Sequence, residues 1–336
     1  MAKRFGIPYE GDMIGRVLTV DRARELNAKN SFYLMLKDNP AMTAIYPGIE
    51  DDLMIGAIDH HIHAYPDFVY RAQDFIEVAI DASKAGMRAL GFKDHYMLTA
   101  NAAHQAQRYI DDMVARGELE HRVEIYGGYG CCLGMDPETI RIALKYPNFK
   151  MIWFPTFTSY GYKRGAELPT DGGVRMVDDN GEVYSNVVEI MHMAAEAKVG
   201  IGLGHTDIVE LLPLCQKGKE FGNRVVLDHP LLELNKLTID EMKACADLGA
   251  YVGTYCQPMI PSLYQAVADP FETIETIRVI GADRCLIGSD FGQVLHVKTI
   301  DGIRIFIRAL LAFGISREEI KVMLNDNPAK LMYLED

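Results

Sequence analysis

Eight short apolar segments alternate with segments of helical periodicity, and this alternation constrains the fold more than any other feature of the chain. Strands that alternate with helices pair in parallel and are joined by right-handed crossovers. The sequence therefore predicts an α/β fold with a TIM-like (β/α)8 barrel, and an open, doubly wound sheet is the alternative. The predicted strands span residues 54–63, 87–92, 122–127, 149–154, 199–205, 224–229, 249–255 and 284–290.

The chain of 336 residues, of which 49% are hydrophobic, is long enough for one large core. Residues 54–336 are expected to form the barrel. Residues 1–53 are polar and rich in turn-forming residues up to Asp21, where a helix with one apolar side is predicted over residues 21–38. This N-terminal helical extension is expected to pack on the barrel or on a partner subunit, and we therefore expect a homo-oligomer.

Residues 155–186 make an unusually long connection between the fourth predicted strand and its helix. Within it, residues alternate around Asn180-Gly181, a pair that is typical of a hairpin with a type I′ turn. A long insertion over the mouth of a barrel is more often a lid or a substrate wall than a filler. We therefore expect a lid insertion after strand four.

The first predicted strand, residues 54–63, ends in Asp-His-His-Ile-His. Because side chains alternate along a strand, Asp59, His61 and His63 are expected to share one face, and His60 is expected to face the helices. Two imidazoles two residues apart at the end of an apolar strand form a bidentate metal chelate. A strand end that merely carries polar residues is the alternative, and the metal site is favoured.

Further potential metal ligands occur at the carboxyl ends of other predicted strands. Active sites of (β/α)8 barrels lie on that face, so these residues are expected to converge. They are Lys93, Asp94 and His95 after strand two, His205 after strand five, Asp228 and His229 after strand six, and Asp290 after strand eight. A hydrogen-bonded polar residue at a strand end is the simpler interpretation for His95 alone.

Two other motif-like stretches are expected to be structural. Gly127-Gly128-Tyr129-Gly130 lacks the spacing of a dinucleotide-binding loop, and we expect a tight turn beneath the site. Cys131-Cys132 has no adjacent basic residue and is expected to be buried packing.

Composition narrows the range of partners. A formal net charge of -13 argues against nucleic acid or an anionic membrane surface as the main partner, so a small-molecule substrate is expected. The six cysteines form no C-x-x-C pair, and the first residues lack the apolar core of a signal peptide. These features predict reduced thiols and a cytoplasmic location. The sequence also contains no apolar run long enough to span a bilayer.

Taken together, the motifs resemble the amidohydrolase superfamily of metal-dependent barrels, and more closely its decarboxylase-like and lactonase branch. The resemblance covers residues 54–336. It rests on Asp59-x-His61-x-His63, His205, His229 and Gly288-Ser289-Asp290-Phe291, with residues 325–331 similar to the C-terminal helix of that family. The metal ligands that the resemblance implies are His61, His63, His205 and Asp290, with His229 as a ligand of a second ion or as an acid or base.

One departure from the family concerns lysine. Many members with two metal ions carry a carboxylated lysine on strand four, whereas residues 151–156 contain none. Lys93, at the end of strand two, is the substitute that we consider, either as a carbamate that bridges two ions or as a neutral amine ligand. A cation beside a metal ion is disfavoured, which favours the uncharged or modified lysine. Pairing of Lys93 with Asp94 or with a substrate carboxylate is an equal alternative.

The predicted activity is hydrolysis of an amide, lactam, lactone or ester bond of a small molecule. A divalent ion, one or two per chain, would activate water, with zinc favoured and manganese or iron as alternatives. Asp290 is the predicted general base, and His229 and His95 are further candidates for proton transfer. The same site could instead serve a decarboxylase or an iron-dependent oxygenase, and a structural or sensing metal is the third hypothesis.

Substrate contacts are expected from residues near the barrel mouth. Aromatic and hydroxyl groups with two adjacent cations suit a flat or carboxylated small molecule, and a solvated basic loop is the alternative. The predicted contacts are Tyr65, Tyr129, Thr156, Tyr160, Tyr162, Lys163, Arg164, Gln257 and Gln293.

Overall fold

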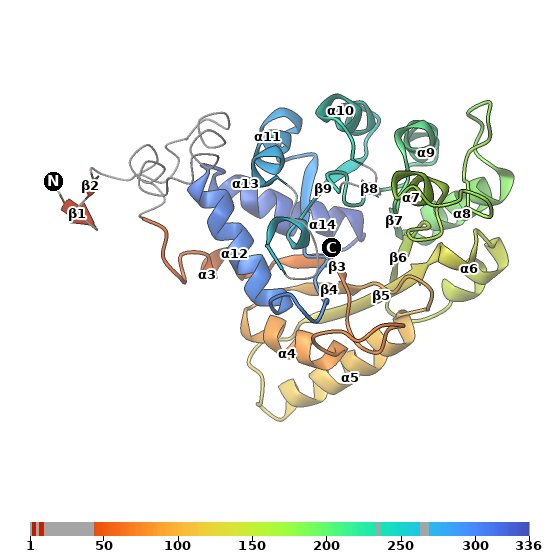
Figure 1. The fold of residues 1–336 in the computed structure, drawn as a ribbon. Helices are drawn as coiled ribbons and strands as arrows, with labels where there is room; N and C mark the ends of the chain where they lie inside the picture. The colour runs from red at the N-terminus through yellow and green to blue at the C-terminus, as the bar shows by residue number, and fades with distance from the viewer. Residues whose placement is uncertain (1, 5–6, 10–43, 233–235, 263–268, 336) are drawn as a thin grey trace.

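A computed structural model describes residues 2–4, 7–9, 44–232, 236–262 and 269–335 (Figure 1). Its main feature is a sheet of eight parallel strands that follow one another in chain order, which confirms the predicted barrel. The strands are β3 (Ile58–Ile62), β4 (Ala89–Phe92), β5 (Glu124–Gly130), β6 (Phe149–Trp153), β7 (Gly200–Gly202), β8 (Val225–Leu227), β9 (Tyr251–Tyr255) and β10 (Cys285–Gly288). The N-terminal strands β1 (Ala2–Arg4) and β2 (Ile7–Tyr9) pair antiparallel to each other.

The barrel closes where its first and last strands meet. The Asp290 amide donates to the His61 carbonyl over 2.9 Å, and the His63 amide donates to the Phe291 carbonyl over 2.8 Å. The Ser289 amide donates to the Asp59 carboxylate over 3.0 Å. These bonds exclude the doubly wound alternative and hold the ends of β3 and β10 together, at the place where the candidate metal ligands lie.

Helices cover the outside of the barrel. In Figure 1, α4 and α5 lie along one side of the sheet and α9, α10 and α11 along another. The helices are α3 (Asp51–Met54), α4 (Phe75–Lys84), α5 (Ala100–Ala115), α6 (Pro137–Ala143), α7 (Tyr160–Gly165), α8 (Ser185–Ala197), α9 (Ile208–Phe221), α10 (Ile239–Asp247), α11 (Pro270–Ile280), α12 (Thr299–Ala312), α13 (Arg317–Lys321) and α14 (Asn327–Leu331). Many begin at a capping side chain, as at Asp74, Asp136 and Thr238, whose oxygens accept hydrogen bonds from backbone amides of the first turn.

Apolar side chains fill the lower half of the barrel interior. Ile58, Met151, Trp153 and Leu286 form a fully buried cluster, and Leu331 at the end of α14 joins it from below. Burying each such side chain stabilises the fold by about 1.5–3 kcal/mol. The interior is therefore a packed floor, above which the polar strand ends face the mouth.

The first strand is shorter than predicted. Met54 ends helix α3, and Ile55 is 63% exposed instead of buried. Gly56 has φ +80° and donates its amide to the Gly86 carbonyl, so the chain turns before it becomes extended at Ile58. A left-handed glycine within an apolar run explains why residues 54–57 look like a strand and are not one.

His60 lies inside the barrel, so the prediction that it faces the helices is wrong. The register of β3 against β4 shifts between Asp59 and Ile62, which is a β-bulge. As a result, His60 and His61 both turn inward, and Nε2 of His60 lies 3.0 Å from the Tyr255 hydroxyl. Strict alternation, on which the prediction relied, does not hold across a bulge.

The glycines of residues 127–130 lie within β5, so the predicted tight turn is wrong. A Cβ atom at Gly128 would lie 1.9 Å from the Met151 carbonyl oxygen. At Gly130 it would lie 2.2 Å from the Asp94 carbonyl oxygen. Glycine is needed here because neighbouring backbones approach closely.

The connection 155–186 contains α7 and the expected hairpin, in which Val177 and Val183 form an antiparallel bridge. The predicted turn type is wrong. Gly181 is left-handed at φ +85° and Asn180 is not, whereas a type I′ turn needs positive φ at both residues. The Gly181 amide donates to the Asp178 carbonyl, as in a type I turn followed by a left-handed glycine.

The structure tests some of the broader predictions and leaves others untested. The helix predicted over residues 21–38 lies outside the described residues, and the division at residue 54 stays a prediction. None of the helices in the described part of the chain is long and apolar enough to cross a bilayer. All six cysteines are buried and form no disulfide.

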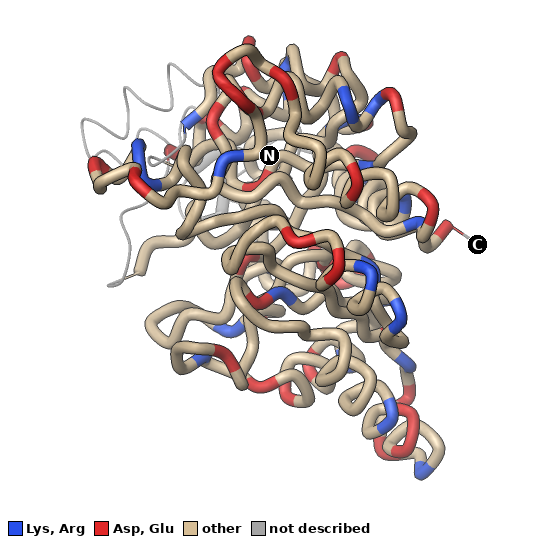
Figure 2. Tube along the Cα trace, turned by 90° about the vertical axis from the view of Figure 1, so that its right-hand side faces the viewer, with Lys and Arg blue, Asp and Glu red and all other residues tan. Residues whose placement is uncertain are grey.

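Figure 2 shows acidic and basic residues interspersed along the chain, without a broad basic face in that view.

Candidate metal centre

Asp290 lies where the ends of three strands meet. Its Oδ1 atom lies 3.4 Å from Nε2 of His61 and 3.3 Å from Nε2 of His63. Its Oδ2 atom lies 3.3 Å from Nε2 of His229. Asp290 and His229 both have positive φ, at +55° and +45°, a strained conformation that is typical of functional sites. The structure thus brings together the residues that the sequence placed at the ends of strands one, six and eight.

These donors fit a divalent metal ion. The ligand atoms of His61, His63 and Asp290 all lie within 4.8 Å of one another. The buried Nδ1 atoms of His205 and His229 have no hydrogen-bond partner among the described residues. The centroids of the two rings are 5.1 Å apart. Imidazole and carboxylate ligands suit zinc, manganese and iron.

Burial favours the protonation states that metal binding requires. It lowers the pKa of His61, His95 and His205 well below the usual value, which keeps the rings neutral. For Asp290, burial alone would raise the pKa. The neighbouring His229, His63 and His61 nevertheless hold it well below the usual range, so the group is a carboxylate. Neutral imidazole and ionised carboxylate are the forms that bind metal ions.

Asp228 and Tyr255 contact Nδ1 of His61, whereas Nε2 of the same ring faces Asp290. Nδ1 of His61 lies 3.3 Å from Asp228 Oδ1 and 3.2 Å from the Tyr255 hydroxyl. That hydroxyl donates to Asp228 Oδ1 over 2.6 Å. A carboxylate that accepts the Nδ1 proton leaves Nε2 free to bind a metal. From the sequence, Asp228 is predicted only as one of the two polar residues that end strand six, because pattern alone does not show which partner it meets.

Lys93 reaches the same cluster. Its Nζ atom lies 3.1 Å from Nε2 of His61, and the residue is 2% exposed. Burial lowers the pKa of the ammonium group, while Asp228 and Asp290 act in the opposite direction. The side chain therefore lies next to the candidate ligands and is not paired with Asp94, whose Oδ1 accepts the amides of Tyr96 and Met97.

His95 lies at the edge of the centre. Its ring stacks on that of His63, with centroids 4.8 Å apart and planes 18° apart. Its Nδ1 atom lies 2.7 Å from Thr156 Oγ1. Thr156, a predicted substrate contact, thus lies behind His95 and orients it.

A cavity of about 520 Å³ opens above the centre. His63, His95, His205, His229 and Asp290 form its base, and its walls are Phe68, Val69, Arg71, Tyr96, Phe157, Tyr162, Leu232, Gln257 and Gln293. Phe157 and Tyr162 come from the insertion after β6, which therefore forms a wall of the site. Gln257, Gln293 and Tyr162 lie where the sequence predicted substrate contacts.

The structure does not bring the other predicted substrate contacts to this cavity. Lys163 Nζ donates to the Asp171 carbonyl, and Arg164 pairs with Asp207 at 3.1 Å. Tyr160 lies under the Arg175 guanidinium. Tyr65 stacks on Tyr70, and Tyr129 pairs through its backbone with Leu98. The two cations proposed to bind an anionic substrate are thus engaged elsewhere.

Arg71 is the cation that lines the cavity, and it is not among the contacts predicted from the sequence. Its Nε atom donates to Asp67 over 2.8 Å, and one terminal nitrogen lies 3.2 Å from Nδ1 of His63. Arg71 and Phe68 come from the irregular loop between β3 and α4. The rule that loops after barrel strands build the site could have indicated this loop, although no motif marks the individual residues.

Comparison with solved structures supports the fold. An amidohydrolase from Burkholderia multivorans with bound HEPES is similar at a TM-score of 0.52 and 11% identity, covering 83% of this chain and 99% of that chain. A structure from the engineering of organophosphate hydrolysis activity from a weak promiscuous lactonase template gives a TM-score of 0.50 and 15% identity, covering 83% and 96%. The chain has the barrel fold of the amidohydrolases, as its motifs predicted.

Sequence comparison then assigns a family. The chain belongs to DUF6282, a family of unknown function, whose model matches residues 56–253. This range contains the candidate ligands from His61 to His229 and ends before Asp290. No curated protein matches the chain.

Proposed function

We propose that this protein is a metal-dependent hydrolase that cleaves an amide, lactam, lactone or ester bond of a small molecule. The observation that carries the proposal is the convergence of His61, His63 and His229 on the two oxygens of Asp290, beneath an open cavity. A purely structural metal site is closed, whereas catalytic sites keep an open position. The similarity to amidohydrolase barrels supports the same class.

His61, His63 and Asp290 would hold one divalent ion, and zinc is the favoured metal. His205 and His229, with Lys93 nearby, would hold a second. When bound, such an ion lowers the pKa of a water ligand toward ~7 and polarises a carbonyl group. Asp290 accepts the proton of the attacking water and delivers it to the leaving group. If only one ion is bound, Nε2 of His229, 3.3 Å from Oδ2 of Asp290, instead holds that carboxylate in place.

Chelation and reconstitution test the proposal. The full-length protein would be freed of metal, reloaded with zinc, manganese or iron, and assayed on a p-nitrophenyl ester, a γ-lactone and an N-acyl amide. We expect hydrolysis of at least one class to disappear on chelation and to return with zinc. Oxygen uptake by the iron form without any hydrolysis would instead establish the oxygenase alternative. The cytoplasmic location and the homo-oligomer stay predictions.

A further inference from the structure

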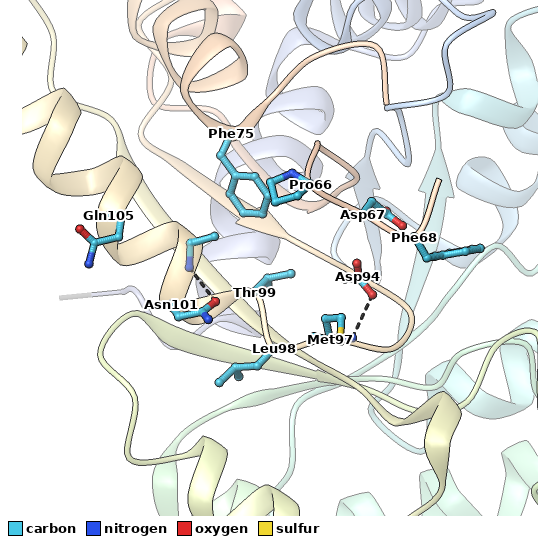
Figure 3. Close-up of a pocket in the computed structure, with 11 residues that line it drawn as sticks. Pro66, Asp67, Phe68, Phe75, Asp94, Met97, Leu98, Thr99, Asn101 and Gln105 are labelled. Atoms are coloured by element: carbon cyan, nitrogen blue, oxygen red, sulfur yellow. Dashed lines mark hydrogen bonds between the residues drawn. The ribbon is translucent and has the colours of Figure 1, made fainter. Parts of the chain in front are cut away.

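A second cavity, of about 680 Å³, lies beside the metal centre. It is formed by the loop after β3, the start of α4, the loop after β4 and the start of α5, and its walls are mostly apolar. Pro66, Phe75, Met97, Leu98 and Ala102 contribute to these walls. Figure 3 shows Asp67 and Asp94 together on one side of the cavity and Gln105 on the opposite side. An apolar chamber with two carboxylates at one end differs from the histidine-rich main cavity.

Each carboxylate is held through one oxygen. Asp67 Oδ2 accepts from Arg71, whereas the buried Oδ1 atom has no partner among the described residues. The Asp67 side chain is fully buried. Asp94 is 4% exposed, and its Oδ1 atom accepts two backbone amides over 2.7 and 2.9 Å. A buried carboxylate without enough donors is destabilising, so a ligand that brings a positive charge and donors would be stabilised here.

Phe68 separates this cavity from the metal centre. Its side chain lines both cavities, and the residue is 55% exposed. Asp67 Oδ2 lies 3.8 Å from Nδ1 of His63, so one of the two carboxylates contacts a candidate metal ligand. A substrate whose reactive bond lies above Asp290 could extend past Phe68 into the second cavity.

We propose that this second cavity is a substrate subsite for an apolar group that ends in a primary ammonium. The inference rests on the proposed function, because it extends the same site. Two carboxylates and the Arg71 guanidinium leave one net negative charge, which an ammonium group neutralises. Its N–H groups would donate to Asp94, the less deeply buried of the two carboxylates, with the negative charge of Asp67 close by, while the apolar chain contacts Met97, Leu98 and Phe75.

Calorimetric binding to the full-length protein tests the ligand class without any catalysis. The probes are hexylammonium chloride, hexanol and sodium hexanoate. We expect hexylammonium to bind at least about tenfold more tightly than hexanol, since a charge-assisted hydrogen bond contributes about 1.5–3 kcal/mol. Asp94→Asn and Ala102→Phe should each weaken its binding by about tenfold or more. Asp112→Asn is the matched control. Asp112 lies on the exposed face of α5, the helix that carries Ala102, and its replacement should leave the affinity for hexylammonium unchanged.

The same experiment can overturn the inference. Equal binding of hexylammonium and hexanol, or wild-type affinity in both Asp94→Asn and Ala102→Phe, would show that the carboxylates select no ammonium group. Using two variants guards against a local folding defect, because Asp94→Asn keeps the side-chain shape whereas Ala102→Phe fills the cavity.

Turnover decides whether the cavity belongs to the substrate site. We expect the metal-loaded protein to prefer the p-nitrophenyl ester of 6-aminohexanoate over that of hexanoate, and the ratio of kcat/KM values to fall about tenfold or more in Asp94→Asn. An unchanged ratio would contradict a substrate role. If neither these esters nor the lactone and amide probes were hydrolysed, the proposed function would fail and the substrate role with it, whereas calorimetry alone still decides whether the cavity takes an ammonium group.

Discussion

Asp290 has an environment that suits a group which both binds a metal ion and transfers a proton. Three histidine nitrogens lie within 3.4 Å of its two oxygens, and it is held in a left-handed backbone conformation. Strain of this kind costs about 1–3 kcal/mol and persists where the surrounding structure enforces it. Here the hydrogen bond from the Asp290 amide to the His61 carbonyl fixes the backbone.

Replacing Asp290 by Asn should therefore keep the barrel folded and remove most of the activity. The amide cannot accept a proton, and general acid–base groups contribute about 10²–10⁴-fold to rate. We expect kcat to fall by about this factor while the thermal unfolding temperature stays near that of wild type. An unchanged kcat would transfer the proton role to His229 or His95.

The effect of replacing Lys93 shows whether the site holds one metal ion or two. If it is a carbamate that bridges two ions, Lys93→Ala should lower occupancy toward one ion per chain, and bicarbonate should aid reconstitution of the wild-type apoprotein. If the amine is a direct ligand, occupancy should fall without any effect of bicarbonate. Full occupancy with a raised KM would show a substrate contact instead. Metal content measured with and without bicarbonate separates these outcomes.

Asp228 should act through His61 and not on the substrate. Asp228→Asn removes the carboxylate that accepts from Nδ1 of His61, and loss of such partners typically weakens metal binding by about 10–100-fold. Competition with a chromogenic chelator measures this affinity. Asp301→Asn, in the first turn of α12, is the control and should bind metal as wild type does. Wild-type affinity in Asp228→Asn would show that another group orients His61.

At the scale of elements, the sequence pattern predicted the strands because they are apolar runs buried on both faces, and the helices because each buries one regular face. It failed where the backbone is irregular. The bulge in β3 turns His60 inward, the left-handed Gly56 shortens the same strand, and the glycines of β5 continue an extended strand. Candidate ligands could be predicted because they lie at strand ends, whereas Arg71 and Phe68 lie in a loop without a pattern.

The glycines of β5 offer a test of this packing. Gly128→Ala would place a methyl group against the Met151 carbonyl, and overpacking of this kind costs about 1–3 kcal/mol or more. Gly117→Ala is a useful comparison, because that glycine has φ +72° and open space around its Cβ position. Chemical denaturation should show the larger loss of unfolding free energy for Gly128→Ala. An equal or smaller loss of unfolding free energy would mean that the backbones of β5 and β6 can move apart to accommodate the methyl group.

At the scale of the whole molecule, a barrel with an apolar floor carries its polar groups at one end, and two cavities open there. The closed ring of strands fixes which residues meet, because the end of β10 returns to the end of β3. Sequence order therefore sufficed to predict the convergence of five strand ends. The insertion after β6, which forms a wall of the main cavity, and the second cavity both depend on loop conformations, which the sequence pattern does not determine.

Metal content of purified variants tests the central claim most directly. The full-length protein, His61→Ala, His63→Ala and the exposed control His192→Ala would be prepared without added metal and measured by elemental analysis. We predict that wild type and His192→Ala carry at least one zinc, manganese or iron ion per chain, and that the other two variants lose it while remaining folded. Wild-type metal content in His61→Ala or His63→Ala, or no metal in any of the four proteins even after reconstitution, would contradict the account.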